Sequence, residues 1–186
     1  APAALDQQHT PLGINGEGFT TTTWLAQTFV PGVSGSLTQL EVALFCSGCS
    51  GANPAITVDI RTTSGGSPTS TVLATTTIPG FSSGASVSYT ANFGPPATLA
   101  SGTTYAYVLR LQTNRTAGDY AATRSQNNQY SSGAWRFSTN SGSSWSVAQG
   151  QDLGFTTFMA QPFVASGNLV SSLKDAIVPA SWTTLS

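Results

Sequence analysis

The sequence predicts an all-β protein, an antiparallel β-sandwich of jelly-roll or immunoglobulin-like type with about eight to ten strands. Runs rich in Val, Ile, Thr, Tyr and Phe recur along the 186 residues, separated by clusters of Gly, Pro, Ser and Asn. This is the pattern of short strands joined by turns. Helical periodicity is nearly absent, so the crossover helices that a parallel sheet requires are not supplied.

Nine strands are expected from these runs. They cover residues 25–30, 37–45, 55–62, 72–77, 86–93, 104–112, 119–124, 134–138 and 154–159. Turn sequences such as Ser64-Gly-Gly-Ser-Pro68 fall between the runs, as the turn preferences of these residues require. The loop Asn140-Ser-Gly-Ser-Ser-Trp145 predicts a hairpin that joins residues 135–138 to residues 145–148.

Alternation of apolar and polar residues indicates which strand faces are buried. Two sets are expected to face the core: Leu40, Val42 and Leu44 in one strand, and Ile56, Val58 and Ile60 in another. Glu41 and Asp59 fall on the opposite, polar faces of these two strands, which we take to be adjacent. We expect Asp59 to pair with Arg61 or to be solvated, as is ordinary for a carboxylate in a strand.

Few residues are charged. They form 7% of the chain and give a formal net charge of −1, against about 25% charged residues in an average protein. The cationic footprint that nucleic acid or anionic lipid would need is missing. A surface rich in hydroxyls and amides lacks strong like-charge repulsion. It therefore permits association with copies of the chain, with neighbouring surface-protein domains or with uncharged glycans.

The start of the chain, Ala1-Pro2-Ala3-Ala4, is typical of the residues that follow a signal-peptide cleavage site. We therefore expect an exported protein at an extracellular or cell-surface location. Membrane insertion is not expected, since no apolar run approaches the roughly 18 residues of a spanning helix. The expected organisation is a β-sandwich domain at 25–162, preceded by segment 1–24 as an exchanged or edge strand. Segment 163–186 is then a linker or the first strand of a following domain.

The two cysteines, Cys46 and Cys49, stand in a Cys-x-x-Cys spacing. No second cysteine pair or histidine pair completes a zinc site. A redox Cys-x-x-Cys begins a helix in a βαβ unit, whereas this one ends a strand and opens a turn. The sequence therefore favours a local disulfide.

Exposed aromatic rings beside amide groups are typical of glycan-binding sites, because the C–H faces of sugars pack on such rings. The candidate glycan-binding residues are Trp24, Tyr120, Tyr130, Trp135, Trp145, Asn127 and Asn128. The alternative interpretation is that several of these rings fill the core and that the amide-rich loop is an ordinary polar loop.

Catalytic signatures are absent from the sequence. His9 is the single histidine, and no Gly-x-Ser-x-Gly nucleophile motif accompanies it, so a surface or packed histidine is expected. No catalytic residue, resident metal or cofactor is assigned. A structural calcium ion is the one metal considered, with Asp6, Asp119 and Asp152 as the first acids to test.

A family resemblance is carried by several strand and turn sequences. They include Leu5-Asp-Gln-Gln8, Leu25-Ala-Gln-Thr-Phe29, Ile56-Thr-Val-Asp-Ile-Arg61, Gly102-Thr-Thr-Tyr-Ala106 and Asp152-Leu-Gly-Phe-Thr156. Together they resemble the choice-of-anchor-type β-sandwich domains of large exported bacterial surface proteins. The resemblance implies the sandwich fold and an exported setting, and it carries no catalytic motif.

The expected function is that of a non-enzymatic extracellular structural or adhesive module. One form of it is the subunit of a self-assembling surface filament, in which a neighbouring copy adds a strand to an open sheet edge. The first alternative is a carbohydrate-binding module of a secreted protein. The second is a phage or virion surface protein with the same sandwich fold.

Overall fold

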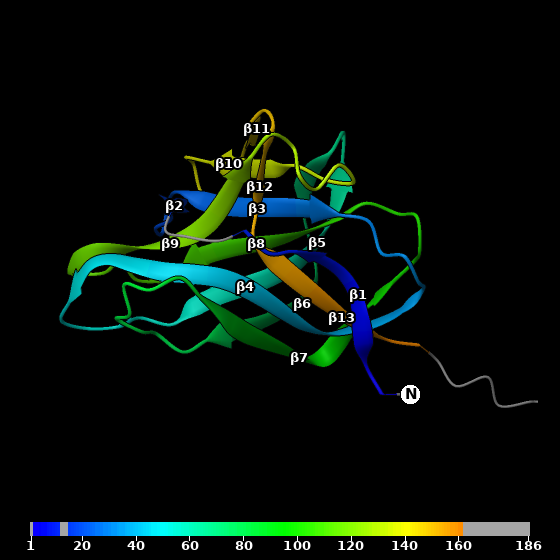
Figure 1. Ribbon diagram of the computed structural model, residues 1–186, viewed down its shortest axis with the longest axis horizontal. Coiled ribbons are helices and arrows are strands. Elements are labelled where there is room, and N and C mark those ends of the chain that lie inside the picture. Colours follow the sequence, from blue (N-terminus) through cyan, green and yellow to red (C-terminus); the bar gives the residue numbers. More distant parts are fainter. Residues whose placement is uncertain (1, 12–14, 162–186) are drawn as a thin grey trace, which may run out of the picture.

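The computed structural model describes residues 2–11 and 15–161. They form two antiparallel sheets packed face to face (Figure 1), which confirms the predicted all-β sandwich. The expected segment 163–186 lies outside the described residues. Among the described residues there is no helix of the length and apolar character needed to cross a membrane.

Seven strands form the first sheet, in the order β1-β13-β4-β9-β12, with β2 beside β9 and β7 beside β4. These strands are β1 (Ala4–His9), β2 (Gly16–Gly18), β4 (Gly35–Ser50), β7 (Val87–Leu99), β9 (Ala117–Gln126), β12 (Gln151–Leu153) and β13 (Phe155–Ala160). Six strands form the second sheet, in the order β11-β10-β3-β8-β5-β6. They are β3 (Trp24–Phe29), β5 (Ile56–Ser64), β6 (Ser67–Ile78), β8 (Tyr105–Leu111), β10 (Trp135–Ser138) and β11 (Ser146–Val147).

The N-terminal segment contributes two strands to the seven-stranded sheet. β1 pairs with β13 and lies at one end of the strand order, and β2 pairs with β9. Both pairings are made within the same chain. The segment expected as an exchanged or edge strand is therefore an edge strand of its own sheet in this structure.

A fork between β4 and β9 organises the seven-stranded sheet. The two strands pair from Leu44 to Ser50 of β4. They separate on the N-terminal side of Leu44, where β4 pairs with β13 instead. β12 pairs with β9 and β13 pairs with β4 (Figure 1), so one continuous stretch of chain fills the fork. Gly154 joins β12 to β13, donating its N–H to Thr123 O (2.8 Å) and accepting a hydrogen bond from Ala43 N (3.2 Å).

The core lies between the sheets and is formed by the alternating residues that the sequence indicates. The two inward sets, Leu40, Val42 and Leu44 from β4 and Ile56, Val58 and Ile60 from β5, are all buried. Both sets were expected to face the core, and the structure confirms this.

The outer face of the six-stranded sheet is also covered, contrary to expectation. Arg136, Ala26, Val108 and Asp59 lie in register across four strands on this face, and Asp59 is only 1% exposed. Ala26 and Val108 give this row small side chains at its centre, and Arg136 Nη1 donates to Ser67 Oγ at the start of β6 (3.4 Å). The prediction of a solvated polar face on β5 is wrong because arginine and tryptophan side chains lie over it.

Glu41 and Asp59 do not lie on adjacent strands, as was expected. Glu41 belongs to β4 of the seven-stranded sheet and Asp59 to β5 of the six-stranded sheet. Residues 51–55 connect β4 to β5 and carry the chain from the seven-stranded sheet to the six-stranded sheet, so the two strands do not form a hairpin. The expected pairing of Asp59 with Arg61 is confirmed, with Nη2 and Oδ2 2.6 Å apart.

Candidate functional site

The predicted disulfide is present at one end of the sandwich. Cys46 and Cys49 are joined at the end of β4, with their Cα atoms 5.7 Å apart, and Gly48 between them has a φ of +64°. A disulfide is compatible with an oxidising extracellular environment.

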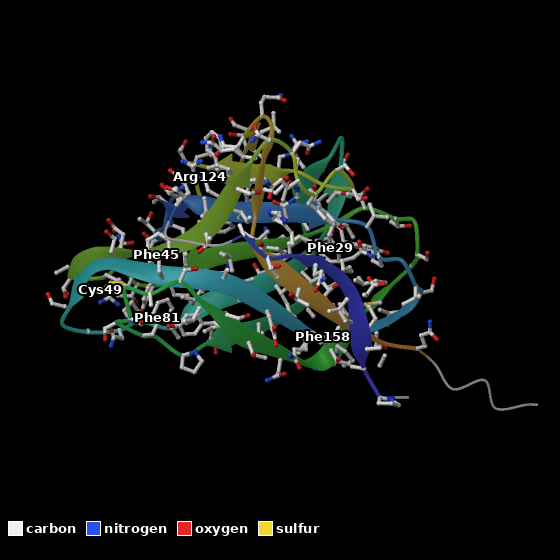
Figure 2. The ribbon with its side chains drawn as sticks, viewed as in Figure 1. Phe29, Phe45, Cys49, Phe81, Arg124 and Phe158 are labelled. Carbon is white, nitrogen blue, oxygen red and sulfur yellow. A yellow bond between two sulfur atoms is a disulfide. The ribbon has the colours of Figure 1, made fainter. Side chains whose placement is uncertain are left out.

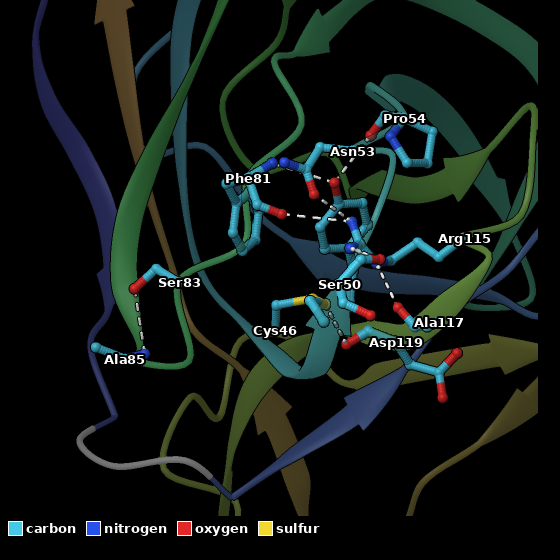
Figure 3. Close-up of a disulfide and its surroundings, with 12 residues drawn as sticks. Cys46, Ser50, Asn53, Pro54, Phe81, Ser83, Ala85, Arg115, Ala117 and Asp119 are labelled. Atoms are coloured by element: carbon cyan, nitrogen blue, oxygen red, sulfur yellow. Dashed lines mark hydrogen bonds between the residues drawn. A yellow bond between two sulfur atoms is a disulfide. The ribbon is translucent and has the colours of Figure 1, made fainter.

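Arg115 holds the loops around this disulfide together (Figure 3). Its guanidinium donates to the carbonyl oxygens of Ser50, Phe81 and Ala117, at 3.5, 3.4 and 3.3 Å, and to Asn53 Oδ1 at 2.9 Å. These hydrogen bonds tie the end of β4 and the connection after it to Phe81 and to the start of β9.

Two of the candidate glycan-binding rings belong to the interior. Tyr120 is fully buried, donating its hydroxyl to Pro54 O and accepting from Phe81 N, both at 3.1 Å. Tyr130 is 8% exposed, and its hydroxyl donates to Gln7 Oε1 at 2.9 Å. Buried tyrosine hydroxyls normally find partners of this kind.

Trp24 and Trp145 lie together on the outer face of the six-stranded sheet. A Cβ placed on Gly142 would lie 2.6 Å from the Trp24 ring and 3.6 Å from the Trp145 ring, so the loop passes closely over both. The guanidinium carbons of Arg61 and Arg110 lie 5.2 and 5.3 Å from the centre of the Trp24 ring. Two guanidinium groups and the Gly142 loop therefore enclose the Trp24 ring.

Trp135, by contrast, lines a pocket between the edges of the two sheets, where β2 and β12 of one sheet come near β3 and β10 of the other. The pocket has a volume of about 350 Å³, within the range of about 300–1,000 Å³ that is usual for small-molecule sites. Its lining combines apolar and polar side chains: Leu25, Trp135, Phe137, Ala148, Glu17, Thr23, Thr139 and Gln151. We call this the aromatic pocket.

The local sequence explains the aromatic wall of this pocket. Trp135 and Phe137 are two residues apart in β10, and side chains at i and i+2 of a strand share one face. Their ring centres are 6.0 Å apart with an interplanar angle of 50°. The predicted hairpin between β10 and β11 is confirmed by the pairs Arg136 with Val147 and Phe137 with Ser146. It carries Ala148 back to the pocket.

Polar groups come to the pocket from the seven-stranded sheet. Glu17 is exposed on β2, and Gln151 begins β12. Arg124, on β9 between them, hydrogen-bonds to Gln151 Oε1 and lies over the Trp135 ring, 5.8 Å from its centre. Figure 2 marks Arg124 where β2, β9 and β10 come together. Sequence reasoning missed Glu17, Phe137, Gln151 and Arg124, although the Trp-x-Phe spacing was visible.

A second hollow, of about 310 Å³, lies beside Arg124. It is lined by Pro11 and by polar residues: Asn15, Arg124, Ser125, Gln126, Asn127 and Gln129. We call it the amide hollow. Of the two candidate asparagines, Asn127 lines it, and Asn128 instead donates its backbone N–H to Gly150 O at 2.9 Å.

His9 is 8% exposed and joined to Ser125 by a hydrogen bond of 2.6 Å between Nε2 and Oγ. Burial lowers the pKa of His9, and the charge of Asp152 only partly offsets this. The carboxylate of Asp152 accepts hydrogen bonds from Gln27 Nε2 (3.1 Å) and Tyr130 N (3.0 Å). It is thus engaged in holding β12 and the loop before β10.

The three acids considered for calcium lie in different settings. Asp152 is fully buried, Asp119 is exposed at the start of β9, and Asp6 accepts a hydrogen bond from Gly32 N at 3.0 Å. Across residues 2–11 and 15–161, no three His, Cys, Asp or Glu residues are grouped as a metal site would require. Calcium binding stays a prediction.

A scan against protein-family models finds none that matches the chain, and a search of curated proteins finds no match either. The resemblance to choice-of-anchor-type domains therefore remains a proposal.

Proposed function

We propose that this protein is a non-enzymatic extracellular adhesive module that binds a neutral glycan in the aromatic pocket. One observation carries the proposal. Two aromatic rings, the half-buried Phe137 and the largely buried Trp135 (5% exposed), share a pocket with the exposed carboxylate of Glu17 and the amide of Gln151, so Phe137 is the more accessible ring. Aromatic rings take the C–H faces of a sugar, and carboxylate and amide groups accept and donate the hydrogen bonds of its hydroxyls.

The charges around the pocket favour a neutral ligand. Glu17 would repel an anionic sugar at close range. The cation beside the pocket is Arg124, whose guanidinium already donates to Gln151 and lies over the Trp135 ring. A neutral glycan needs no counter-charge and accepts hydrogen bonds from either amide or hydroxyl donors.

An exported setting agrees with this function. The chain is 7% charged and carries a disulfide, and disulfides persist in oxidising compartments. The composition also suits contact with uncharged polymers. These features support an extracellular or cell-surface location.

Assembly into a filament is a second proposal, favoured by one observation. β1 stands at one end of its sheet, and its Leu5 side chain is 52% exposed. An edge strand of this kind can accept a strand from another copy. Sedimentation velocity over a concentration series tests it. Growing polymers that are lost in a Leu5→Lys variant support assembly, and a single monomer species at every concentration contradicts it.

Glycan binding is tested on a panel of neutral polysaccharides by affinity electrophoresis and glycan array. Phe137→Ala removes one ring and Glu17→Gln removes one charged acceptor, while Trp135 is kept because it also packs in the core. Phe158→Ala and Glu41→Gln are the matched controls, since both residues are partly exposed and remote from the pocket lining.

The expected result is binding that the two pocket variants weaken and the two controls retain, with unchanged thermal unfolding for Glu17→Gln. Binding that all four variants retain, or no binding to any neutral glycan, contradicts the proposal.

A further inference from the structure

The aromatic pocket and the amide hollow are neighbours, separated by one hydrogen-bonded pair of side chains. Arg124 lines the amide hollow, and its guanidinium bonds to Gln151, which lines the aromatic pocket. Gln126 of the hollow pairs in register with the same Gln151. Asn15 and Glu17, two residues apart, line the hollow and the pocket respectively. The lining residues of the two hollows are thus linked by the Arg124–Gln151 hydrogen bond and by the neighbouring positions Asn15 and Glu17.

The two hollows differ in chemistry. The aromatic pocket is lined by the rings of Trp135 and Phe137 and by the apolar side chains of Leu25 and Ala148. The amide hollow offers the side-chain amides of Asn15, Gln126, Asn127 and Gln129, each of which can both donate and accept hydrogen bonds. Sugar hydroxyls also donate and accept hydrogen bonds, so they are complementary to side-chain amides.

The loop that carries the amides is held in an unusual backbone conformation. Asn127 and Asn128 have φ values of +70° and +46°, in the left-handed region that costs a non-glycine residue free energy. The hydrogen bond from Asn128 N to Gly150 O fixes this loop to the segment that enters β12. Asparagine is the non-glycine residue that tolerates this region best, and Asn127 lines the hollow.

We propose that the two hollows are subsites of one groove and that the ligand is an extended neutral oligosaccharide, with one part against Trp135 and Phe137 and the next against the amides. This inference rests on the proposed function. The volumes, about 350 and 310 Å³, lie singly at the low end of the usual range for small-molecule sites. Together they accommodate a chain longer than either would hold. The bridge between Arg124 and Gln151 forms the floor where the chain passes from one subsite to the next.

Two subsites on one ligand make affinity depend on ligand length. Once the first part of a chain is bound, the second subsite meets the next part at high effective concentration. A ligand that fills one subsite gains nothing from the other. Affinity should therefore rise steeply at the length that reaches the amide hollow and then level off.

The test is isothermal titration calorimetry with neutral β-1,4-linked gluco-, xylo- and N-acetylgluco-oligosaccharides, each as a series from disaccharide to hexasaccharide. Asn127→Gly removes the amide that lines the hollow and keeps a residue that tolerates positive φ. Asn128→Gly is the matched control, because Asn128 shares the backbone conformation and does not line the hollow.

We expect affinity for one series to rise by about tenfold or more between the short and the long members. Asn127→Gly should reduce affinity for the long members to that for the short ones and leave the short ones unchanged, while Asn128→Gly should bind like the wild type. Affinity that is the same at every length, or equal effects of the two glycine variants, overturns the inference. If binding of the disaccharide still depends on Phe137, the proposed function survives that result. If no oligosaccharide binds, both proposals fail.

Discussion

At the scale of single residues, the few cations of this chain are used inside the structure. Four arginines lie over aromatic rings: Arg61 and Arg110 over Trp24, Arg115 over Tyr120, and Arg124 over Trp135. Guanidinium groups suit this role because they are planar and weakly hydrated. The exposed surface is left to hydroxyls and amides, which is the surface a neutral glycan requires.

Asp59 is the anion that balances the arginines on the outer face of the six-stranded sheet. It accepts hydrogen bonds from Arg61 Nη2 (2.6 Å), Arg110 Nε (3.0 Å) and Thr75 Oγ1 (2.8 Å). Burial by itself raises the pKa of this carboxyl, but the hydrogen bonds from Arg110, Arg61 and Thr75 outweigh it, and the pKa lies below its ordinary value.

We predict that Asp59→Asn lowers the free energy of unfolding by about 2–3 kcal/mol, because two guanidinium groups lose their partner. The lowered pKa means that the stabilisation is complete above the unfolded-state pKa of about 3.9 and is lost as pH falls through the folded-state value. Urea unfolding from pH 7 to pH 3 measures both effects. The exposed Asp119→Asn is the control, and equal losses for the two variants would refute the role assigned to Asp59.

His9 makes the stability of the fold depend on pH in a second, higher range. Its lowered pKa means that the unfolded chain binds a proton more readily than the folded one, so stability is full above the unfolded-state pKa of about 6.5 and declines as pH falls below it. We expect the urea midpoint to fall between pH 7 and pH 5 and this slope to be reduced in His9→Gln, which retains a partner for Ser125. An identical slope in wild type and variant would contradict the assignment.

At this scale, the sequence predicts inward-facing residues well and outward-facing ones less well. Leu40 and Ile56 stand in alternating patterns that identify the core face. Thr57 and Arg61 stand in the same kind of pattern, yet they are 3% and 8% exposed. Their burial depends on Trp24 and Arg110 from other strands, and alternation within one strand carries no information about what lies over its polar face.

At the scale of elements, the fork between β4 and β9 determines how the seven-stranded sheet closes. The chain passes from β12 to β13 through Gly154, where a Cβ would lie 2.9 Å from Ala43 Cβ and 3.0 Å from Pro11 Cδ. Both contacts are tighter than ordinary van der Waals packing, and backbone hydrogen bonds hold Gly154 on either side. The position therefore requires a residue without a side chain.

Gly154→Ala is predicted to destabilise the fold by about 1–3 kcal/mol, the usual cost of overpacking a closed site. Differential scanning calorimetry and urea unfolding measure it. Gly84→Ala is the matched control, since the nearest atom to its added Cβ, Cys46 O, is at an ordinary 3.5 Å. A Gly154→Ala variant as stable as the control would show that the fork tolerates a side chain.

Strands with an apolar face were predictable, and polar or glycine-rich ones were not. The nine expected runs each overlap a strand of the structure, with boundaries that shift by several residues in β4, β6 and β7. β1 and β2 were expected only as part of an exchanged or edge segment, because Ala4–His9 is polar and Gly16–Gly18 contains two glycines. They are strands because β13 and β9 offer unpaired edges, and edge pairing is decided by the neighbouring strand more than by local propensity.

At the scale of the whole molecule, the disulfide and the aromatic pocket lie in different parts of the sandwich. The disulfide and Arg115 close one end (Figure 3). The aromatic pocket lies between the edges of the two sheets. Composition favours uncharged polymers as ligands, because charge-poor surfaces suit them, and this stays a prediction. It could not locate the pocket, since Glu17, Trp135 and Gln151 meet only when both sheets are in place.

The candidate residues chosen by type were therefore distributed over the molecule. Trp135 and Asn127 line the two hollows, whereas Tyr120 is fully buried and Trp24 lies beneath arginines. Aromatic residues in a sandwich fill the core as readily as they bind ligands. Only their position relative to both sheets separates the two roles.

The most direct test of the account is a titration followed by NMR, using the indole N–H resonances of the tryptophans. We predict that the neutral oligosaccharide with the highest affinity shifts the resonance of Trp135 and of the backbone amide of Asn127, and leaves those of Trp24 and Trp145 in place. A titration in which Trp135 does not respond to any neutral oligosaccharide, or in which Trp24 or Trp145 responds in its stead, would contradict the placement of the binding site between the sheet edges.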